Sequence, residues 1–219
     1  MPLPNGVDPF GNIGALCPDA GLMGNRGILH EALYGPVVKD WQHKSWVACR
    51  MGFGDWQRGV LVDGKLQLMA QLNEYSELFF LDEATAFAGG HRPCGTCRKH
   101  DYASFKNHWC RAHEIAPDTF DRNKVDRTLH QERCACIRRN KVSFEARLGE
   151  LPEGAMFVIG GKPCLKWKQK LWLWSDTGYV QREGKISAST LVDVLTPHSM
   201  FRVLEAGYPL QVHQTAAFA

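Results

Sequence analysis

The feature that most constrains this chain is the Cys94-Gly-Thr-Cys97 turn, which follows a Gly-Gly pair and precedes a basic, aromatic segment. Two cysteines separated by two residues let the backbone fold back so that both sulfurs can reach one ion. Behind the second cysteine, Tyr102, Phe105 and Trp109 recur at helical spacing. A helix N-terminus favours the thiolate form of cysteine. The turn therefore predicts half of a metal site.

The sequence offers no second pair of this kind. Cys134 and Cys136 are only two positions apart, and no other Cys-x-x-Cys or His-x-x-x-His occurs. Three interpretations of Cys94 and Cys97 stay open, namely a structural metal site, a thiol redox pair and two plain thiols. The redox pair is the weaker alternative to the metal site, because the turn does not follow a strand–helix–strand pattern.

The cysteine content and the apolar pattern indicate the class of protein. Eight cysteines without a secretory signal favour a reducing compartment, so we expect a cytoplasmic protein. No run reaches the roughly 18 consecutive apolar residues of a membrane helix, so we expect no membrane partner. Apolar residues make up 44% and charged residues 22%, which is typical of a globular protein.

The order of local patterns predicts an α+β fold. Residues 1–40 are rich in Gly and Pro and are expected to form an irregular arm. Residues 82–90 are predicted as a short helix, with Asp82 as its N-cap and a Gly-Gly end. The other predicted elements are strands at 45–53, 75–81 and within 154–174, a hairpin at 59–72, helices from about 97 and over 121–135, and a strand then a helix at 191–209.

Positive charge is unevenly spread along the chain. The net charge is only +3, but cations gather in two runs, at 92–111 and 122–141. Such clusters suit a phosphate backbone, so DNA is the expected partner. The alternative is two solvated helix faces, which basic runs commonly form. The cations expected to contact nucleic acid are Arg92, Arg98, Lys99, Arg127 and Arg133.

The segment "FFLDEATAFAGGHRPCGTCRK", residues 79–99, resembles the end of the zinc-binding domain of Ada-type DNA-repair proteins. That domain runs from a strand with paired aromatics through an Ala-rich helix and a Gly into an Arg-Pro-Cys-x-x-Cys knuckle. Upstream, "WVACRMGF" resembles the strand that carries the family's first zinc cysteine, which makes Cys49 the matching position. The chain also resembles a group of bacterial proteins with a shared "LFFLDEATA…GHRPC…CR" core, which implies no activity.

The Ada resemblance implies a small zinc-knuckle α/β core and a specific chemistry. In that family four cysteines hold Zn²⁺, and one of the upstream pair accepts a methyl group from a methylated DNA phosphate. Carried onto this sequence, Cys49 is the candidate reactive thiolate, held together with Cys94 and Cys97. Zinc keeps sulfur deprotonated at neutral pH, and a thiolate attacks a methyl carbon directly.

The upstream cysteine pair of the family is incomplete here, because four residues after Cys49 stands Phe53. A further ligand must then come from elsewhere in the chain. His130 is favoured, since Arg127, Glu132 and Arg133 surround it with polar groups in the sequence. The candidates for this ligand are Cys17, His30, His43, His91, His100 and His130.

A change in sequence character near residue 150 predicts three parts. Residues 1–115 are expected to form the Ada-like zinc-binding core with its N-terminal arm. Residues 116–150 are a predicted helical connector, and residues 151–219 a β-rich subdomain that ends in a helix.

The sequence therefore predicts a zinc-binding, DNA-associated protein in which Cys49 acts on DNA lesions. A competing enzyme hypothesis is a zinc-dependent nuclease or hydrolase, because His130 and Glu132 beside a zinc ion could activate water. A competing hypothesis without catalysis is a DNA- or protein-binding module in which the metal only stabilises the fold.

Overall fold

The computed structural model describes residues 5–15, 17–31, 37–53, 56–57, 60–62, 65–67, 75–137 and 143–216. Within these residues the chain forms helices and two six-stranded sheets, which confirms the predicted α+β class. None of the helices in these ranges combines the length and the apolar run needed to cross a membrane.

The first sheet has the strand order β10-β4-β3-β9-β1-β2. Strand β4 pairs antiparallel with β3 on one side and parallel with β10 on the other. Three of these strands lie in the segment expected to be an irregular arm, because short strands in a Gly-rich stretch leave little periodicity in the sequence. The strands are β1 (Gly6–Val7), β2 (Ile13–Ala15), β3 (Leu22–Asn25), β4 (Val47–Arg50), β9 (Leu78–Phe80) and β10 (Arg92–Pro93).

Two small hairpins follow β4. The hairpin predicted at 59–72 is confirmed where its described residues pair, and its remaining residues lie outside the described part of the chain. The hairpin strands are β5 (Gly52–Phe53) with β6 (Trp56–Gln57) and β7 (Val60–Val62) with β8 (Lys65–Gln67).

The helices begin close to their predicted positions. Asp82 accepts a hydrogen bond from the Thr85 backbone N–H at 2.9 Å, which confirms it as an N-cap. The chain leaves this helix through Gly90, whose φ of +79° favours glycine. The helical elements are α1 (Glu83–Ala88), α2 (Lys99–Ala112), α3 (Arg122–Ile137) and α4 (His198–Glu205), with short 3₁₀ turns η1 (Pro117–Thr119), η2 (Leu148–Glu150) and η3 (Gln214–Ala216).

The second sheet is antiparallel throughout, with the order β11-β16-β12-β13-β14-β15. Its strand β11 precedes residue 150 in the chain and pairs with β16. Strands β13 and β14 meet at Lys168 and Gln169, which both have positive φ, as a tight hairpin turn requires. The strands are β11 (Phe144–Arg147), β12 (Met156–Ile159), β13 (Lys162–Trp167), β14 (Lys170–Ser175), β15 (Gly178–Gln181) and β16 (Leu191–Val194).

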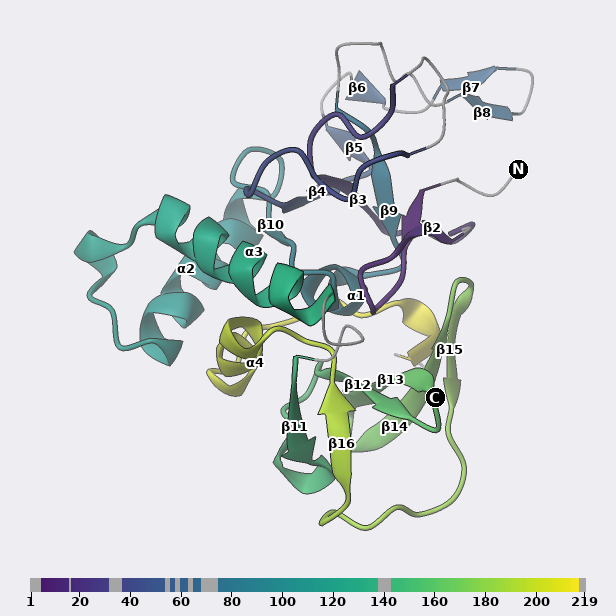
Figure 1. Ribbon diagram of the computed structural model, residues 1–219, viewed down its shortest axis with the longest axis vertical. Helices are drawn as coiled ribbons and strands as arrows, with labels where there is room; N and C mark the ends of the chain where they lie inside the picture. The colour runs from purple at the N-terminus through teal and green to yellow at the C-terminus, as the bar shows by residue number, and fades with distance from the viewer. Residues whose placement is uncertain are drawn as a thin grey trace.

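One hydrophobic core joins the two halves of the chain. Phe79, Phe87 and Phe105 from the first part belong to the same buried cluster as Met156 and Trp172 from the second sheet. Figure 1 shows the two sheets at opposite ends of the molecule, with α1 and α4 between them. The second sheet therefore packs on the first part of the chain through these helices.

A buried ion pair links the cysteine turn to this shared core. The Arg98 guanidinium donates to Glu83 at 2.6 Å and to Asp101 at 2.8 Å. Glu83 also accepts hydrogen bonds from the Tyr208 hydroxyl and from the Gln211 backbone N–H, each at 3.0 Å. The residue that follows Cys97 in the chain is thereby fixed to the C-terminal segment.

The replacement Glu83→Ala would leave the Arg98 guanidinium without its most buried partner, where the arginine side chain is 1% exposed. Because an uncompensated buried charge costs about 3–5 kcal/mol, we expect the free energy of unfolding in urea to fall by about 3 kcal/mol. The matched control is Glu150→Ala, which breaks an exposed pair with Arg147 and should cost less than about 1 kcal/mol. Equal losses in the two variants would contradict the structural role of the buried pair.

Candidate metal centre

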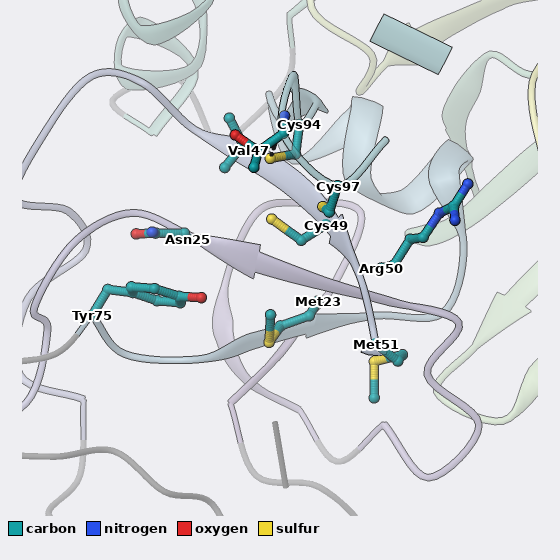
Figure 2. Close-up of a pocket in the computed structure, with 10 residues that line it drawn as sticks. Met23, Asn25, Val47, Cys49, Arg50, Met51, Tyr75, Cys94 and Cys97 are labelled. Carbon is teal, nitrogen blue, oxygen red and sulfur yellow. Dashed lines mark hydrogen bonds between the residues drawn. The ribbon is translucent and has the colours of Figure 1, made fainter. Parts of the chain in front are cut away.

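Three cysteine sulfurs from two distant parts of the sequence meet beside β4. The Sγ atoms of Cys49, Cys94 and Cys97 all lie within 4.8 Å of one another. Figure 2 shows the three sulfurs directed toward one another. Cys97 is buried, whereas Cys49 and Cys94 are half-buried. The structure therefore brings together the three cysteines that the sequence indicated as ligands.

The parallel pairing of β10 with β4 produces this convergence. Pro93 lies opposite Ala48 in the ladder, and the Cys94 backbone N–H continues it by donating to the Ala48 carbonyl at 3.0 Å. The chain then folds back, because the Arg98 backbone N–H donates to the Cys94 carbonyl at 3.0 Å. This turn brings the Cys97 sulfur to the other two.

Backbone donors point at the two sulfurs of the turn. The Thr96 N–H donates to the Cys94 Sγ at 3.4 Å, and the Arg50 N–H donates to the Cys97 sulfur. The Cys49 sulfur forms hydrogen bonds with the other two thiols. Backbone N–H groups stabilise thiolates, so the turn is already arranged to hold negative charge on sulfur.

The three thiols change one another's acidity. The hydrogen bond with Cys49 lowers the pKa of Cys94 to about 4, with backbone donors adding to the effect. The same hydrogen bond, together with burial, raises the pKa of Cys49. Burial raises the pKa of Cys97 as well. In the metal-free protein, Cys94 is therefore the first of the three thiols to lose its proton as the pH rises.

The donor set fits Zn²⁺. Zinc binds thiolates at about 2.3 Å in a tetrahedron, which places its sulfur ligands about 3.8 Å apart. The separation of less than 4.8 Å between the three Sγ atoms is compatible with that spacing after small side-chain rotations. Three soft sulfur donors in a turn that stabilises thiolates also match the ligand preference of zinc.

The structure does not bring His130 to these sulfurs, which corrects the sequence-based prediction of a fourth ligand. Its ring packs edge-on against Trp41 and Trp46, with centroids 5.3 Å from each. Its Nε2 atom lies 3.4 Å from the Cys134 sulfur, one turn further along α3. The polar neighbours that favoured this histidine in the sequence turn toward other partners.

The other candidates for a fourth ligand are also elsewhere. Among the described residues, the group of metal-binding side chains around the turn contains three cysteines and no further member. His91, for example, is fully buried, stacks on Trp46 and faces the Arg26 guanidinium. The candidates that the structure places outside the cluster are Cys17, His30, His43, His91, His100 and His130.

Glu132 has a structural partner rather than a catalytic one. Its carboxylate accepts from the Ser199 hydroxyl at 2.8 Å and from the Ser199 backbone N–H at 3.2 Å. Ser199 lies in the first turn of α4, so Glu132 caps that helix from α3. The hydrolase arrangement of His130 with Glu132 beside a metal does not occur among the described residues.

Three of the five predicted DNA contacts are buried. Arg92 pairs with Asp126 at 2.6 Å, and Arg98 pairs with Glu83 as described above. Arg133 is 1% exposed and donates to the Leu195 carbonyl at 3.1 Å. Their positive charges are therefore directed into the protein. The two predicted contacts that remain on the surface are Lys99 and Arg127.

A cavity of about 360 Å³ borders the three sulfurs. It is enclosed by β3, β4, the cysteine turn and the residues before β9 (Figure 2). The cavity gives a ligand access to the sulfurs, which the sequence did not reveal because its walls come from separate segments. The lining residues besides the cysteines are Met23, Asn25, Val47, Arg50, Met51, Tyr75 and Thr96.

Comparisons of the chain with models of protein families, with curated proteins and with solved structures gave no match. The interpretation of the cysteine cluster therefore depends on its own geometry and on the local resemblance in the sequence.

The acidity of Cys94 leads to a prediction for the metal-free protein. Because its pKa is about 4, against 9.0 for an ordinary thiol, the Cys94 sulfur should stay ionised and reactive as the pH falls, until the pH reaches about 4. Mass spectrometry of iodoacetamide adducts over a range of pH, with a chelator present, would measure this for each cysteine.

Two variants test the cause of this acidity. In Cys49→Ala the hydrogen bond to Cys94 is lost, so the alkylation profile of Cys94 should move toward higher pH. In Cys110→Ala, which removes a buried thiol outside the cluster, the profile should not change. An unperturbed Cys94 profile in the unaltered protein would contradict the prediction.

Proposed function

We propose that the chain is a zinc-thiolate protein in which Cys49 accepts an alkyl group from a DNA lesion. The observation that carries the proposal is the meeting of Cys49 with the Cys94–Cys97 turn beside a cavity. In this proposal, the core around the turn has the strand, helix and cysteine knuckle of the Ada-type domains, as the resemblance of residues 79–99 suggests.

The three cysteines would hold the ion, and bound zinc would keep their sulfurs deprotonated at neutral pH. A tetrahedral ion with three protein ligands has one position left for another group, as in many catalytic zinc sites. The backbone N–H donors of Thr96 and Arg50 support the charge on the two turn sulfurs.

Cys49 is the best nucleophile of the three. The backbone N–H groups directed at Cys94 and Cys97 withdraw electron density from those sulfurs, which makes them weaker nucleophiles. The Cys49 sulfur has the two neighbouring thiols as hydrogen-bond partners. In the proposed transfer, Cys49 forms a bond to the alkyl carbon, and the bond to the leaving oxygen breaks with its electron pair.

DNA as the source of the alkyl group is supported by the Ada resemblance and by two exposed cations. Lys99 lies at the start of α2, two residues after Cys97, and Arg127 is more than half exposed on α3. Each can contact a phosphate without breaking a buried ion pair. The chain as a whole is mildly basic, with a pI near 8.4.

Zinc content tests the first part of the proposal. We expect one zinc ion per chain in the purified protein by elemental analysis. Ser substitution of any of the three cysteines should weaken zinc binding by more than about tenfold, since even changes around a ligand have that effect. The control variants Cys110→Ser and His130→Ala should retain the metal, and an equal loss in all five variants would contradict the assignment.

Methyl transfer tests the second part. After incubation with methylated DNA, intact-protein mass spectrometry should show a permanent gain of one methyl group, located on Cys49 by peptide mapping. Cys49→Ser should show none, whereas Cys164→Ser, which alters a buried thiol in β13, should react normally. Multiple turnover that disappears in Glu132→Ala would instead indicate a hydrolase. Salt-sensitive DNA binding without either result would indicate a binding module.

A further inference from the structure

The floor of the cavity is one face of the β3–β4 ladder. Met23 lies opposite Cys49 in the register, and Asn25 lies opposite Val47. Side chains alternate between the two faces of a strand, so these four share the face that borders the cavity. Residues directly opposite each other have Cβ atoms about 5 Å apart, so Met23 and Cys49 are cross-strand neighbours in the wall of the cavity.

The side chains that face the cavity are uncharged apart from the cysteines. Met23, Met51 and Val47 are apolar, and Tyr75 contributes an aromatic ring. Arg50 also borders the cavity, but Figure 2 shows its side chain directed away from the three sulfurs. The cavity therefore offers no cationic group to balance the charge of an anionic ligand.

Asn25 provides an oriented polar group in this wall. Its Oδ1 atom accepts from the Gly27 backbone N–H at 2.7 Å and contacts His43 Nε2 at 3.2 Å. Both partners occupy the oxygen, so the amide nitrogen is the atom that Asn25 can offer to a ligand. Such a group recognises a hydrogen-bond acceptor and does not require charge.

We propose that the cavity binds an uncharged aromatic alkyl donor, whose ring lies against Met23 and Tyr75 and whose acceptor atom faces the Asn25 amide. This inference rests on the proposed alkyl transfer to Cys49 and adds the class of donor. A volume of about 360 Å³ is near the lower end for ligand pockets and suits one substituted ring. The donor can be a free small molecule or an uncharged, accessible lesion within DNA.

Aryl sulfonate methyl esters are suitable probes, because they carry the methyl group, a ring and acceptor oxygens. The Cys49 sulfur forms the new bond to the methyl carbon, and the carbon–oxygen bond breaks with its electron pair on the sulfonate. The neutral probe is methyl para-nitrobenzenesulfonate. The charged probes have the same scaffold with a para-carboxylate or a para-trimethylammonium group.

The measurement is the rate of methylation of Cys49 in the zinc-loaded protein, relative to the rate of N-acetylcysteine with the same probe. We expect the protein to favour the neutral probe over the carboxylate probe by about tenfold more than the free thiol does, a difference of about 1.4 kcal/mol. The trimethylammonium probe should not react faster than the neutral probe, again relative to the free thiol. Ratios equal to those of the free thiol, or a preference for a charged probe, would overturn the proposal.

Substitutions at Met23 separate charge from packing. Met23→Lys places an ammonium group opposite Cys49 and should shift the preference toward the carboxylate probe by about tenfold. The matched control Met23→Leu keeps an apolar side chain of similar volume, so the preference for the neutral probe should remain. A shift of the same size in both variants would contradict the proposed binding site.

Asn25→Asp tests the polar contact, because it keeps the oxygen that the Gly27 N–H contacts and removes the amide donor. The neutral probe should react more slowly with this variant, while zinc content stays at one ion per chain. As a readout without methyl transfer, the N-methylsulfonamide of the neutral probe should protect Cys49 from iodoacetamide, and the N-methylsulfonamide of the carboxylate probe should not. Equal protection by both sulfonamides would also overturn the proposal.

Failure of this inference can be distinguished from failure of the proposed function. If no probe and no methylated DNA modifies Cys49, the alkyl-transfer function itself is wrong. If every probe modifies Cys49 with the selectivity of the free thiol, the function remains and the donor class is wrong. A neutral lesion in DNA and the free probe can then be compared directly to identify the source of the donor.

Discussion

The site depends on the parallel pairing of two short strands. Strand β10 has two residues, yet its ladder with β4, extended by the Cys94 N–H to the Ala48 carbonyl, places distant cysteines side by side. Closing the long loop between them costs conformational entropy, which this pairing and the surrounding core must offset. A metal held by all three sulfurs would stabilise the same closure, so metal binding and the local fold should support each other.

The second half of the chain contributes no ligand to the cluster but holds it in place. At the N-terminus of α1, Asp82 accepts from the Tyr179 hydroxyl and the His213 N–H, both of which belong to the second half. Glu83 joins Arg98 to the segment that follows α4. Two consecutive acids therefore connect the cysteine turn with the second sheet. This explains why the larger hydrophobic cluster contains residues from both halves of the chain, although the sequence changes character near residue 150.

The sequence was informative where the signal is local. Helix α1 has a cap and a Gly-Gly end within a few residues, and the Cys94–Cys97 turn has its own spacing, so both could be predicted. Cys49 could be matched because its strand carries part of a recognisable pattern. The burial of Arg92 could not be predicted, because its partner Asp126 lies on another element. A basic run has the same appearance in sequence whether its cations reach solvent or distant acids. For His130, polar neighbours in sequence turned out to face other partners, since α3 packs on several elements at once.

The distribution of charge also bears on the chemistry that this site can perform. A protein that binds the DNA phosphate backbone tightly usually exposes arginines to the phosphates. Here Arg92, Arg98 and Arg133 are buried and form contacts in the protein interior instead. Beside the cluster, the walls are thioether, aromatic and amide groups. Selection of an anionic ligand is disfavoured in such a cavity, because Arg50 is directed away from the sulfurs and the other lining side chains carry no positive charge. Shape, desolvation and one oriented hydrogen bond then determine which ligand binds. That environment favours an uncharged alkyl donor, since such a donor loses little hydration when it enters the cavity.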